Sequence, residues 1–141
     1  MIGWPPPSPG DLVWCHFPFL PATQPGPKPR PALVVAVRTF EDGVAAQVAH
    51  GTTQRTASLR SGEFLISKDR HAVALKQAGL AFDTKFDLTK VIELPWSERY
   101  FKVPPRPNPA FGQTPKLGSL HASMLRALEA ASASSQSVVG L

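Results

Sequence analysis

The chain has 141 residues and a formal net charge of +5. This length predicts one domain, and a content of 43% hydrophobic and 18% charged residues is ordinary for a globular protein rather than a disordered one. One cysteine, Cys15, excludes an internal disulfide and a metal site built on several cysteines. The basic charge favours RNA, DNA or acidic protein segments as partners, although many soluble domains carry such a charge without binding nucleic acid.

The first residues have neither a basic segment nor a long apolar run, so they do not read as a signal peptide. No window approaches the ~20 apolar residues of a membrane span. The four histidines have no compact ligand spacing. We therefore expect a cytoplasmic protein with no membrane partner, no metal and no cofactor.

The apolar runs in the first two thirds of the chain are short and rich in β-branched and aromatic residues, which predicts strands. Residues 1–9 form a proline-rich lead-in, and the barrel described below is expected over 10–103. The predicted strands span residues 12–17, 31–37, 44–50, 63–66 and 91–96. Residues 41–43 are a turn that makes a hairpin of the second and third strands. Residues 18–30 are predicted to form a proline-restricted loop.

The remaining segments are less regular. Residues 72–75 are apolar but of undetermined type, and residues 80–82 are expected to begin a further strand. A proline-rich connector covers 104–116. The helical spacing of five apolar residues predicts a helix over 117–130, with Ser119 as a candidate N-cap and a frayed tail over 131–141. The five are Leu117, Leu120, Met124, Leu125 and Leu128.

This order of elements predicts a mainly β fold, a small closed or nearly closed barrel with a C-terminal helix packed on it. The helix has two interpretations. It covers the barrel, or its apolar face joins a dimer interface or receives a partner.

Three segments in order resemble the opening half of the PemK/MazF toxin family. They are Gly10-Asp11-Leu12-Val13-Trp14, Arg30-Pro31-Ala32-Leu33-Val34-Val35 and Thr52-Thr53-Gln54. The similarity continues loosely through residues 87–96. It implies an SH3-like barrel that forms a homodimer, cleaves single-stranded RNA or mRNA, and is inhibited by a cognate antitoxin. It also implies that the toxin–antitoxin complex can contact operator DNA.

The chemistry implied by the family is transesterification, in which the neighbouring 2′-hydroxyl of RNA attacks the phosphorus. Such a reaction needs a base, an acid and a cation, but no protein nucleophile and no metal. The family places its catalytic arginine in the Arg-Pro step, which here is Arg30. A guanidinium between Pro29 and Pro31 is suited to a bidentate phosphate contact. The alternative is a solvated arginine before a strand.

Thr52 corresponds to the active-site threonine of the family, and its hydroxyl can bind the scissile phosphate. Its alternative is a turn with a side-chain-to-backbone hydrogen bond. The acid and base are less defined. His16 is one candidate, because histidine is the side chain that most often acts as a general acid or base, and His50, which precedes the threonine pair, ranks equally with it. Some members carry an arginine and an aspartate on the later strand, for which Lys90 and Glu93 are the candidates; a solvated strand edge is the alternative.

Further RNA contacts are predicted at exposed polar, basic and aromatic positions. They are Thr53, Gln54, Lys85, Lys90, Phe19 and Lys28. Trp14, Phe17 and Trp96 could also stack on bases, but aromatic side chains on strands are more often packed in the core than exposed to a ligand. Two other functions stay open: a barrel that binds RNA, DNA or peptide without cleaving it, and a toxin-like scaffold that retains only antitoxin binding.

Overall fold

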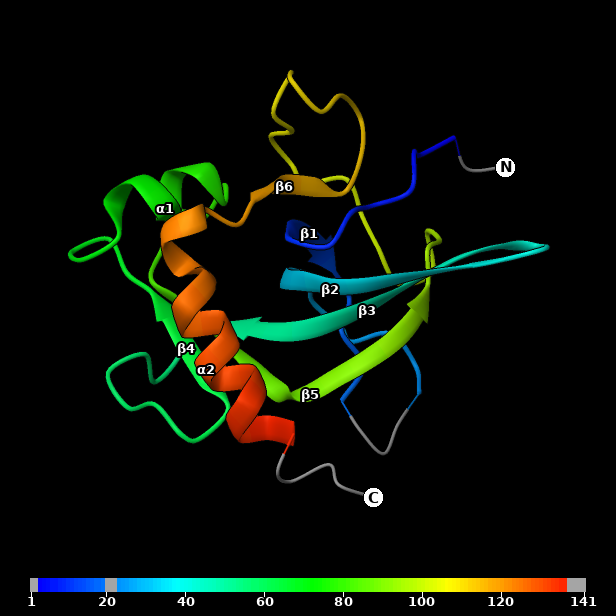
Figure 1. Ribbon diagram of the computed structural model, residues 1–141. Helices are drawn as coiled ribbons and strands as arrows, with labels where there is room; N and C mark the ends of the chain where they lie inside the picture. Colours follow the sequence, from blue (N-terminus) through cyan, green and yellow to red (C-terminus); the bar gives the residue numbers. More distant parts are fainter. Residues whose placement is uncertain (1–2, 20–22, 137–141) are drawn as a thin grey trace.

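The structure is a computed structural model that describes residues 3–19 and 23–136. Its centre is one antiparallel sheet with the strand order β4-β5-β3-β2-β1-β6 (Figure 1). The strands are β1 (Asp11–Cys15), β2 (Arg30–Phe40), β3 (Gly43–Thr52), β4 (Glu63–Ile66), β5 (Thr84–Pro95) and β6 (Lys116–Ser119). The helices are α1 (Ala72–Gln77), a 3-10 turn (Ala122–Met124) and α2 (Leu125–Gln136).

The predicted mainly β fold with a C-terminal helix is confirmed. Within the described residues, however, the sheet is not closed into a barrel, because β4 and β6 remain as its two edges. Both edge strands have four residues. Such short edges offer few unpaired backbone groups to another chain.

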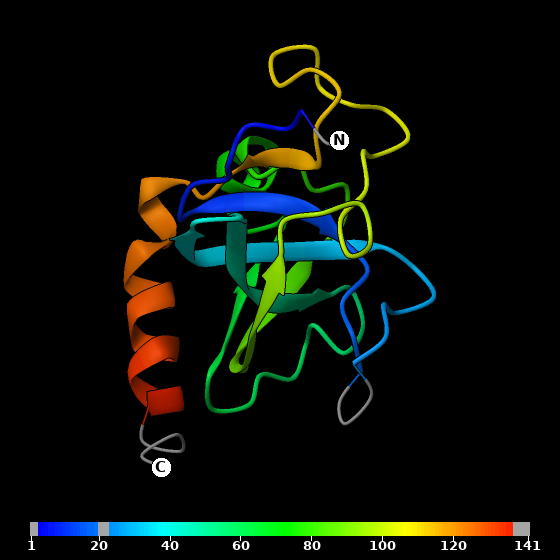
Figure 2. The ribbon, with the colours of Figure 1, turned by 90° about the vertical axis from the view of Figure 1, so that its right-hand side faces the viewer.

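Apolar side chains fill both faces of the sheet, which explains the continuous apolar run of β2. Leu33 belongs to a cluster that includes Leu12 and Ala49 and is covered by α1 and α2. Ala32 and Val34 point to the opposite face, because successive side chains of a strand alternate. Figure 2 shows α2 lying along one side of the sheet. On the other side, no helix of the described residues covers the cluster around Ala32, and loops close it instead.

The helix predicted over 117–130 is wrong at its start. Lys116–Ser119 is a strand, and Ser119 pairs with Asp11 rather than capping a helix. Pairing with β1 overrides the helical spacing of the leucines, because a strand of four residues is too short to show a period of its own. The cap is His121, whose side chain accepts the amide of Ser123. The small residues expected to fray continue α2 as far as Gln136, while 137–141 lie outside the described residues.

Two other segments differ from the sequence prediction. Residues 72–75, of undetermined type, lie in α1. Residues 80–82 do not begin a strand; Ala81 and Phe82 form a bend, and β5 starts at Thr84. The bend is fixed from outside the segment, because the Asp83 carboxylate accepts the amide of Lys68 at 2.7 Å. No helix in the described part of the chain is long and apolar enough to cross a membrane.

The proline-rich loop after β1 is tied to the body of the protein at several points. The Tyr100 hydroxyl donates to the Thr23 carbonyl at 2.9 Å, and the His16 amide donates to the Tyr100 carbonyl at 2.7 Å. Gly26 donates its amide to the His16 carbonyl. A Cβ on Gly26 would collide with the carbonyl of Phe17, so the two arms of the loop approach as closely as glycine allows.

Two glycines with positive φ provide a test of the packing between α1 and β6. Gly79 (φ +73°) lies against the Leu117 carbonyl, which a Cβ would strike, whereas Gly112 (φ +67°) has open space around it. Gly112→Ala should lower the free energy of unfolding by about 1 kcal/mol, because alanine is strained in the left-handed backbone region. Gly79→Ala should cost at least about 3 kcal/mol, because overpacking adds to that strain. Urea unfolding of both variants measures the difference, and equal losses would contradict the close packing of α1 on β6.

Candidate functional site

Polar side chains gather where β2, β3 and β5 lie side by side, on the face opposite α2. His50 is directly opposite Ala32 of β2 and Asp87 of β5. Continuing the β2–β3 register by two residues places Arg30 opposite Thr52. Directly opposed residues of an antiparallel pair point to the same face. Arg30, His50, Thr52 and Asp87 therefore form one group, called here the polar row.

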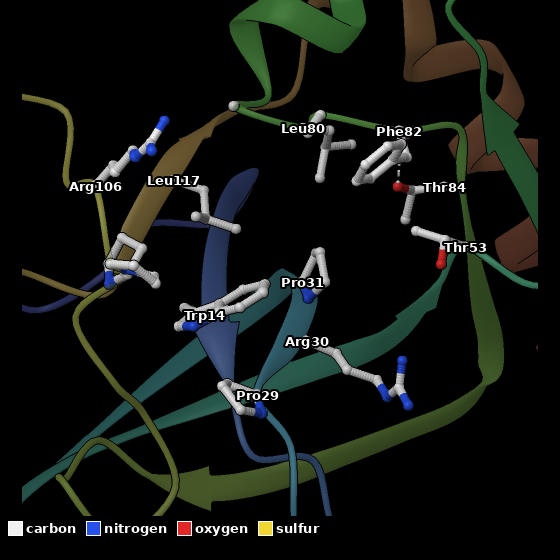
Figure 3. Close-up of a pocket in the computed structure, with 14 residues that line it drawn as sticks. Trp14, Pro29, Arg30, Pro31, Thr53, Leu80, Phe82, Thr84, Arg106 and Leu117 are labelled. Carbon is white, nitrogen blue, oxygen red and sulfur yellow. Dashed lines mark hydrogen bonds between the residues drawn. The ribbon is translucent and has the colours of Figure 1, made fainter.

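Arg30 begins β2 and is half-buried, between Pro29 and Pro31. Its backbone pairs with Cys15. Figure 3 shows its guanidinium extending away from the labelled apolar residues, on the side where Thr53 lies. No ion pair within the described residues involves Arg30. The positive charge therefore remains free to bind an anion.

Thr52 makes the turn hydrogen bond, and its hydroxyl keeps a hydrogen that it can donate. Its Oγ1 accepts the amide of Gln54 at 3.1 Å, as a turn requires. A hydroxyl has one hydrogen to donate in addition to the lone pairs with which it accepts. The Thr52 hydroxyl can therefore hold the turn and donate to a phosphate oxygen at the same time.

His50 lies between the aromatic side chains of the first loop and the charges of the polar row. Its ring centroid is 4.9 Å from that of Phe17 and 6.1 Å from that of Phe19. Burial lowers the pKa of His50, and the charges of Arg30 and Lys90 lower it further, while Asp87 acts in the opposite direction. The imidazole is therefore neutral near pH 7 and able to accept a proton.

Asp87 is the member of the polar row that the sequence analysis missed. Its Oδ1 accepts both the amide and the hydroxyl of Thr89, which fixes the carboxylate opposite His50. The resemblance predicts a cation and a carboxylate on this strand, and the sequence analysis took Lys90 and Glu93 as the candidates. The signal that could have found Asp87 is its spacing of two from Lys85, which puts both side chains on one face of a strand.

The structure does not bring Glu93 to Arg30. Glu93 is paired with Gln47, five residues before Thr52 along β3, which is a separation of roughly 17 Å. Its carboxylate accepts from Arg38 at 3.3 Å and from Gln47 at 3.2 Å. The expectation that Glu93 acts as acid or base beside Arg30 is therefore set aside.

His16 has a structural contact. Its Nδ1 lies 2.9 Å from the Gly26 carbonyl, and its backbone is also bound to both Gly26 and Tyr100. These contacts join the ends of the proline-rich loop. Of the two histidines that ranked equally from the sequence, His50 is therefore the one within the polar row.

Lys85 is corrected from an RNA contact to a buried structural residue. Its ammonium binds Glu63 at 3.1 Å and the Ser58 carbonyl at 3.0 Å, and the two charged side chains are only 8% and 9% exposed. The sequence could not show this burial, because it depends on how the loop 53–62 folds over β5. The pair holds that loop, and with it Gln54, beside Thr52.

The other predicted RNA contacts lie at the surface around the polar row. Lys28, Gln54 and Lys90 are exposed, and the Phe19 side chain is 53% exposed. Lys90 is close enough to affect the pKa of His50. Phe17 is buried, as expected for a core aromatic residue.

An apolar pocket of about 490 Å³ lies at the same end of β2, and Arg30 is among the residues that line it (Figure 3). Trp14 is directly opposite Pro31, so both point away from the face that carries Arg30. Leu80, Phe82 and Leu117 complete its walls, and Thr53 lies at its edge. This Trp14 pocket is in the size range of small-molecule sites and can hold a flat apolar group.

Cys15 does not supply a nucleophile to this region. The side chain is fully buried, and burial raises the pKa of its thiol far above the usual value. Only the thiolate is strongly nucleophilic. Residues 3–19 and 23–136 contain no group of three or more histidine, cysteine, aspartate or glutamate side chains placed to hold a metal ion.

Comparison with known proteins adds no relative. No protein-family model matches the chain, and no curated protein matches it either. The resemblance to the PemK/MazF toxins therefore depends on the three sequence segments and the looser similarity over residues 87–96.

Replacing Lys85 tests whether it is structural. Lys85→Met should destabilise the protein by about 3 kcal/mol, because it leaves the Glu63 carboxylate buried without its partner. Lys85→Met combined with Glu63→Gln should lose less unfolding free energy than the sum of the two single variants, because the second change removes the carboxylate that the first leaves unpaired. The side-chain oxygen of glutamine can still accept the backbone amide of Arg60, which donates to Glu63 at 2.7 Å. Chemical denaturation measures both. A fully stable Lys85→Met variant would contradict the structural role.

Proposed function

We propose that the chain is a PemK/MazF-like toxin with an SH3-like fold, an endoribonuclease that cleaves single-stranded RNA without a metal. The observation that carries this proposal is the register that sets Arg30 opposite Thr52. These two residues come from separate sequence segments, and both were expected at the active site from the resemblance alone. Because they face each other at the open end of one hairpin, their side chains can reach the same phosphate group.

The geometry fits transesterification. A guanidinium with no carboxylate partner can form two parallel hydrogen bonds to the scissile phosphate. The Thr52 hydroxyl can donate a third, and both interactions strengthen as negative charge develops on the phosphorane oxygens. Because the nucleophile is the substrate's own 2′-hydroxyl, the protein has only to hold this linkage and to move protons.

Single-stranded RNA suits the surroundings of the polar row. Lys28 and Lys90 add exposed positive charge to which the backbone of RNA can bind. Phe19 and the Trp14 pocket offer apolar surfaces on which unpaired bases can stack. A duplex would hide those bases, so an unpaired strand is the substrate that uses both features.

The partners follow from the resemblance. We infer a homodimer, a cognate antitoxin that inhibits it, and contact with operator DNA through the toxin–antitoxin complex. We also infer a cytoplasmic location, which places the enzyme with its mRNA substrate.

A second candidate function is an RNA-binding module that does not cleave. It is favoured by the positions of His16 and Glu93, because these two of the acid–base candidates expected from the sequence lie outside the polar row. Binding of RNA without cleavage by the wild-type protein would support this alternative.

Cleavage of a long single-stranded RNA in EDTA tests the main proposal. Arg30→Ala and Thr52→Val should each lower the cleavage rate on the order of 100-fold, because each removes a donor to the developing charge. The rate is measured from single-turnover product formation, with product ends identified as 2′,3′-cyclic phosphate and 5′-hydroxyl.

Arg38→Ala and Thr39→Val are matched controls. Both residues are exposed on β2, and Arg38 is at the end of the sheet where Glu93 lies. These variants should cleave at the wild-type rate. Activity that needs a divalent ion, or an equal loss in Arg30→Ala and Arg38→Ala, would contradict the proposal.

Phe82 tests whether the Trp14 pocket takes a base. Its side chain is 70% exposed at the pocket, and Val73, on α1, is 69% exposed and is not part of it. Phe82→Ala should weaken RNA binding about tenfold, because base stacking is worth ~1–3 kcal/mol. Val73→Ala should leave the affinity unchanged. Fluorescence anisotropy with a labelled RNA carrying 2′-deoxy sugars measures both, and equal affinities would exclude the pocket as a base site.

A further inference from the structure

His50 differs from the other three histidines in its hydrogen bonding. Nδ1 of His16 contacts the Gly26 carbonyl, Nδ1 of His71 accepts the Ser67 amide, and Nδ1 of His121 accepts the Ser123 amide. The Nε2 atom of His50 is buried and has no hydrogen-bond partner among the described residues. An unsatisfied buried polar atom is rare, and it is frequently a sign of function.

One of the two aromatic side chains that lie against the His50 ring is exposed to solvent. Phe17 is buried and belongs to the core, whereas Phe19 is largely exposed and contacts the His50 ring edge-on. The rest of the His50 residue is only partly buried. Displacement of one exposed ring, for instance by a base that stacks on Phe19, therefore gives Nε2 access to a ligand.

The charges around His50 suit a proton acceptor. Arg30 faces it from β2, and Asp87 and Lys90 face it from β5, while the first loop contributes the uncharged rings. The two cations favour the neutral imidazole before reaction. The carboxylate of Asp87, directly opposite, stabilises the imidazolium that forms when a proton arrives.

We propose that His50 is the catalytic base of this site, an assignment that rests on the proposed nuclease function. A ring nitrogen of His50 accepts the proton of the 2′-hydroxyl as the 2′-oxygen forms its bond to phosphorus. The bond from phosphorus to the 5′-oxygen breaks, and the leaving oxygen takes a proton from water. The products are a 2′,3′-cyclic phosphate and a 5′-hydroxyl, and no oxidant or further reactant is needed.

Other candidate bases are less suitable. The Asp87 Oδ1 already accepts two hydrogen bonds from Thr89, and Nδ1 of His16 is engaged with Gly26. Asp87 is instead a positioning residue, which acts through the imidazole that it faces.

His50→Gln in the RNA cleavage assay tests this assignment. We expect kcat to fall on the order of 100-fold or more, with KM changed less than about threefold, because general base catalysis contributes ~10²–10⁴ to a rate. Added imidazole should restore part of the activity of His50→Ala. His121→Asn is the matched control, since asparagine is a good helix cap and His121 lies outside the polar row; it should retain wild-type activity.

The pH dependence gives a second readout. The wild-type rate should fall as the pH drops through the lowered pKa of His50, below its ordinary ~6.5, because the protonated ring cannot accept a proton. Lys90→Ala should move this acidic limb to higher pH, since it removes a charge that lowers the pKa. NMR titration of the His50 ring should show the same midpoints and does not require activity.

The outcomes separate the two proposals. If wild-type protein cleaves RNA and His50→Gln does so within about threefold with the same acidic limb, His50 is not the base and the nuclease function stands. If wild-type protein does not cleave RNA, both proposals fail. Thermal unfolding of His50→Gln shows whether this variant is still folded at the assay temperature. If it is unfolded there and imidazole does not rescue His50→Ala, the assignment of His50 as the base is overturned.

Discussion

The candidate site depends on how closely β3 approaches β2 at Gly51. A Cβ at this position would lie 2.5 Å from the Pro31 carbonyl oxygen and 2.7 Å from the Phe86 ring, so only glycine allows the observed register. That register sets Thr52 beside Arg30. A slip of one residue would turn every side chain of β3 to the other face and exchange the polar row for core residues.

A second constraint is the irregularity in the pairing of β3 with β5. Ala49 is opposite Val91, but the next residue, His50, is opposite Asp87 rather than Lys90. In a regular antiparallel ladder, the neighbour of His50 would have been Lys90. The bulge therefore gives the imidazole a carboxylate in place of an ammonium, and leaves Lys90 exposed beside it. Bulges that redirect side chains in this way are common next to active sites.

The sequence predicted what depends on local pattern and missed what depends on distant pairing. The strands around Arg30 and Thr52 follow from apolar runs and turn residues. The spacing of Asp87 from Lys85 shows only that the two share a strand face; that Asp87 lies opposite His50 depends on the bulge in the pairing of β5 with β3. Lys85 was misplaced because the loop that buries it folds back from another strand. Leu117 was assigned to a helix for the same reason, since the strand in which it lies, β6, pairs with β1 near the other end of the chain.

The two faces at the end of β2 place a geometric demand on the proposed substrate. Arg30 lies on the strand face with His50 and Thr52 and also lines the Trp14 pocket, whereas Pro31 lies on the other face of the strand, with Trp14. A strand of RNA whose phosphate binds the first face and whose neighbouring base enters the second must bend at the linkage between them. Attack by the 2′-hydroxyl requires that it come into line with the leaving 5′-oxygen, and a bent backbone brings it closer to that alignment. Because Arg30 lines the pocket and also belongs to the polar row, a base held in the pocket would contribute to catalysis by orienting the linkage bound at Arg30, in addition to binding the RNA.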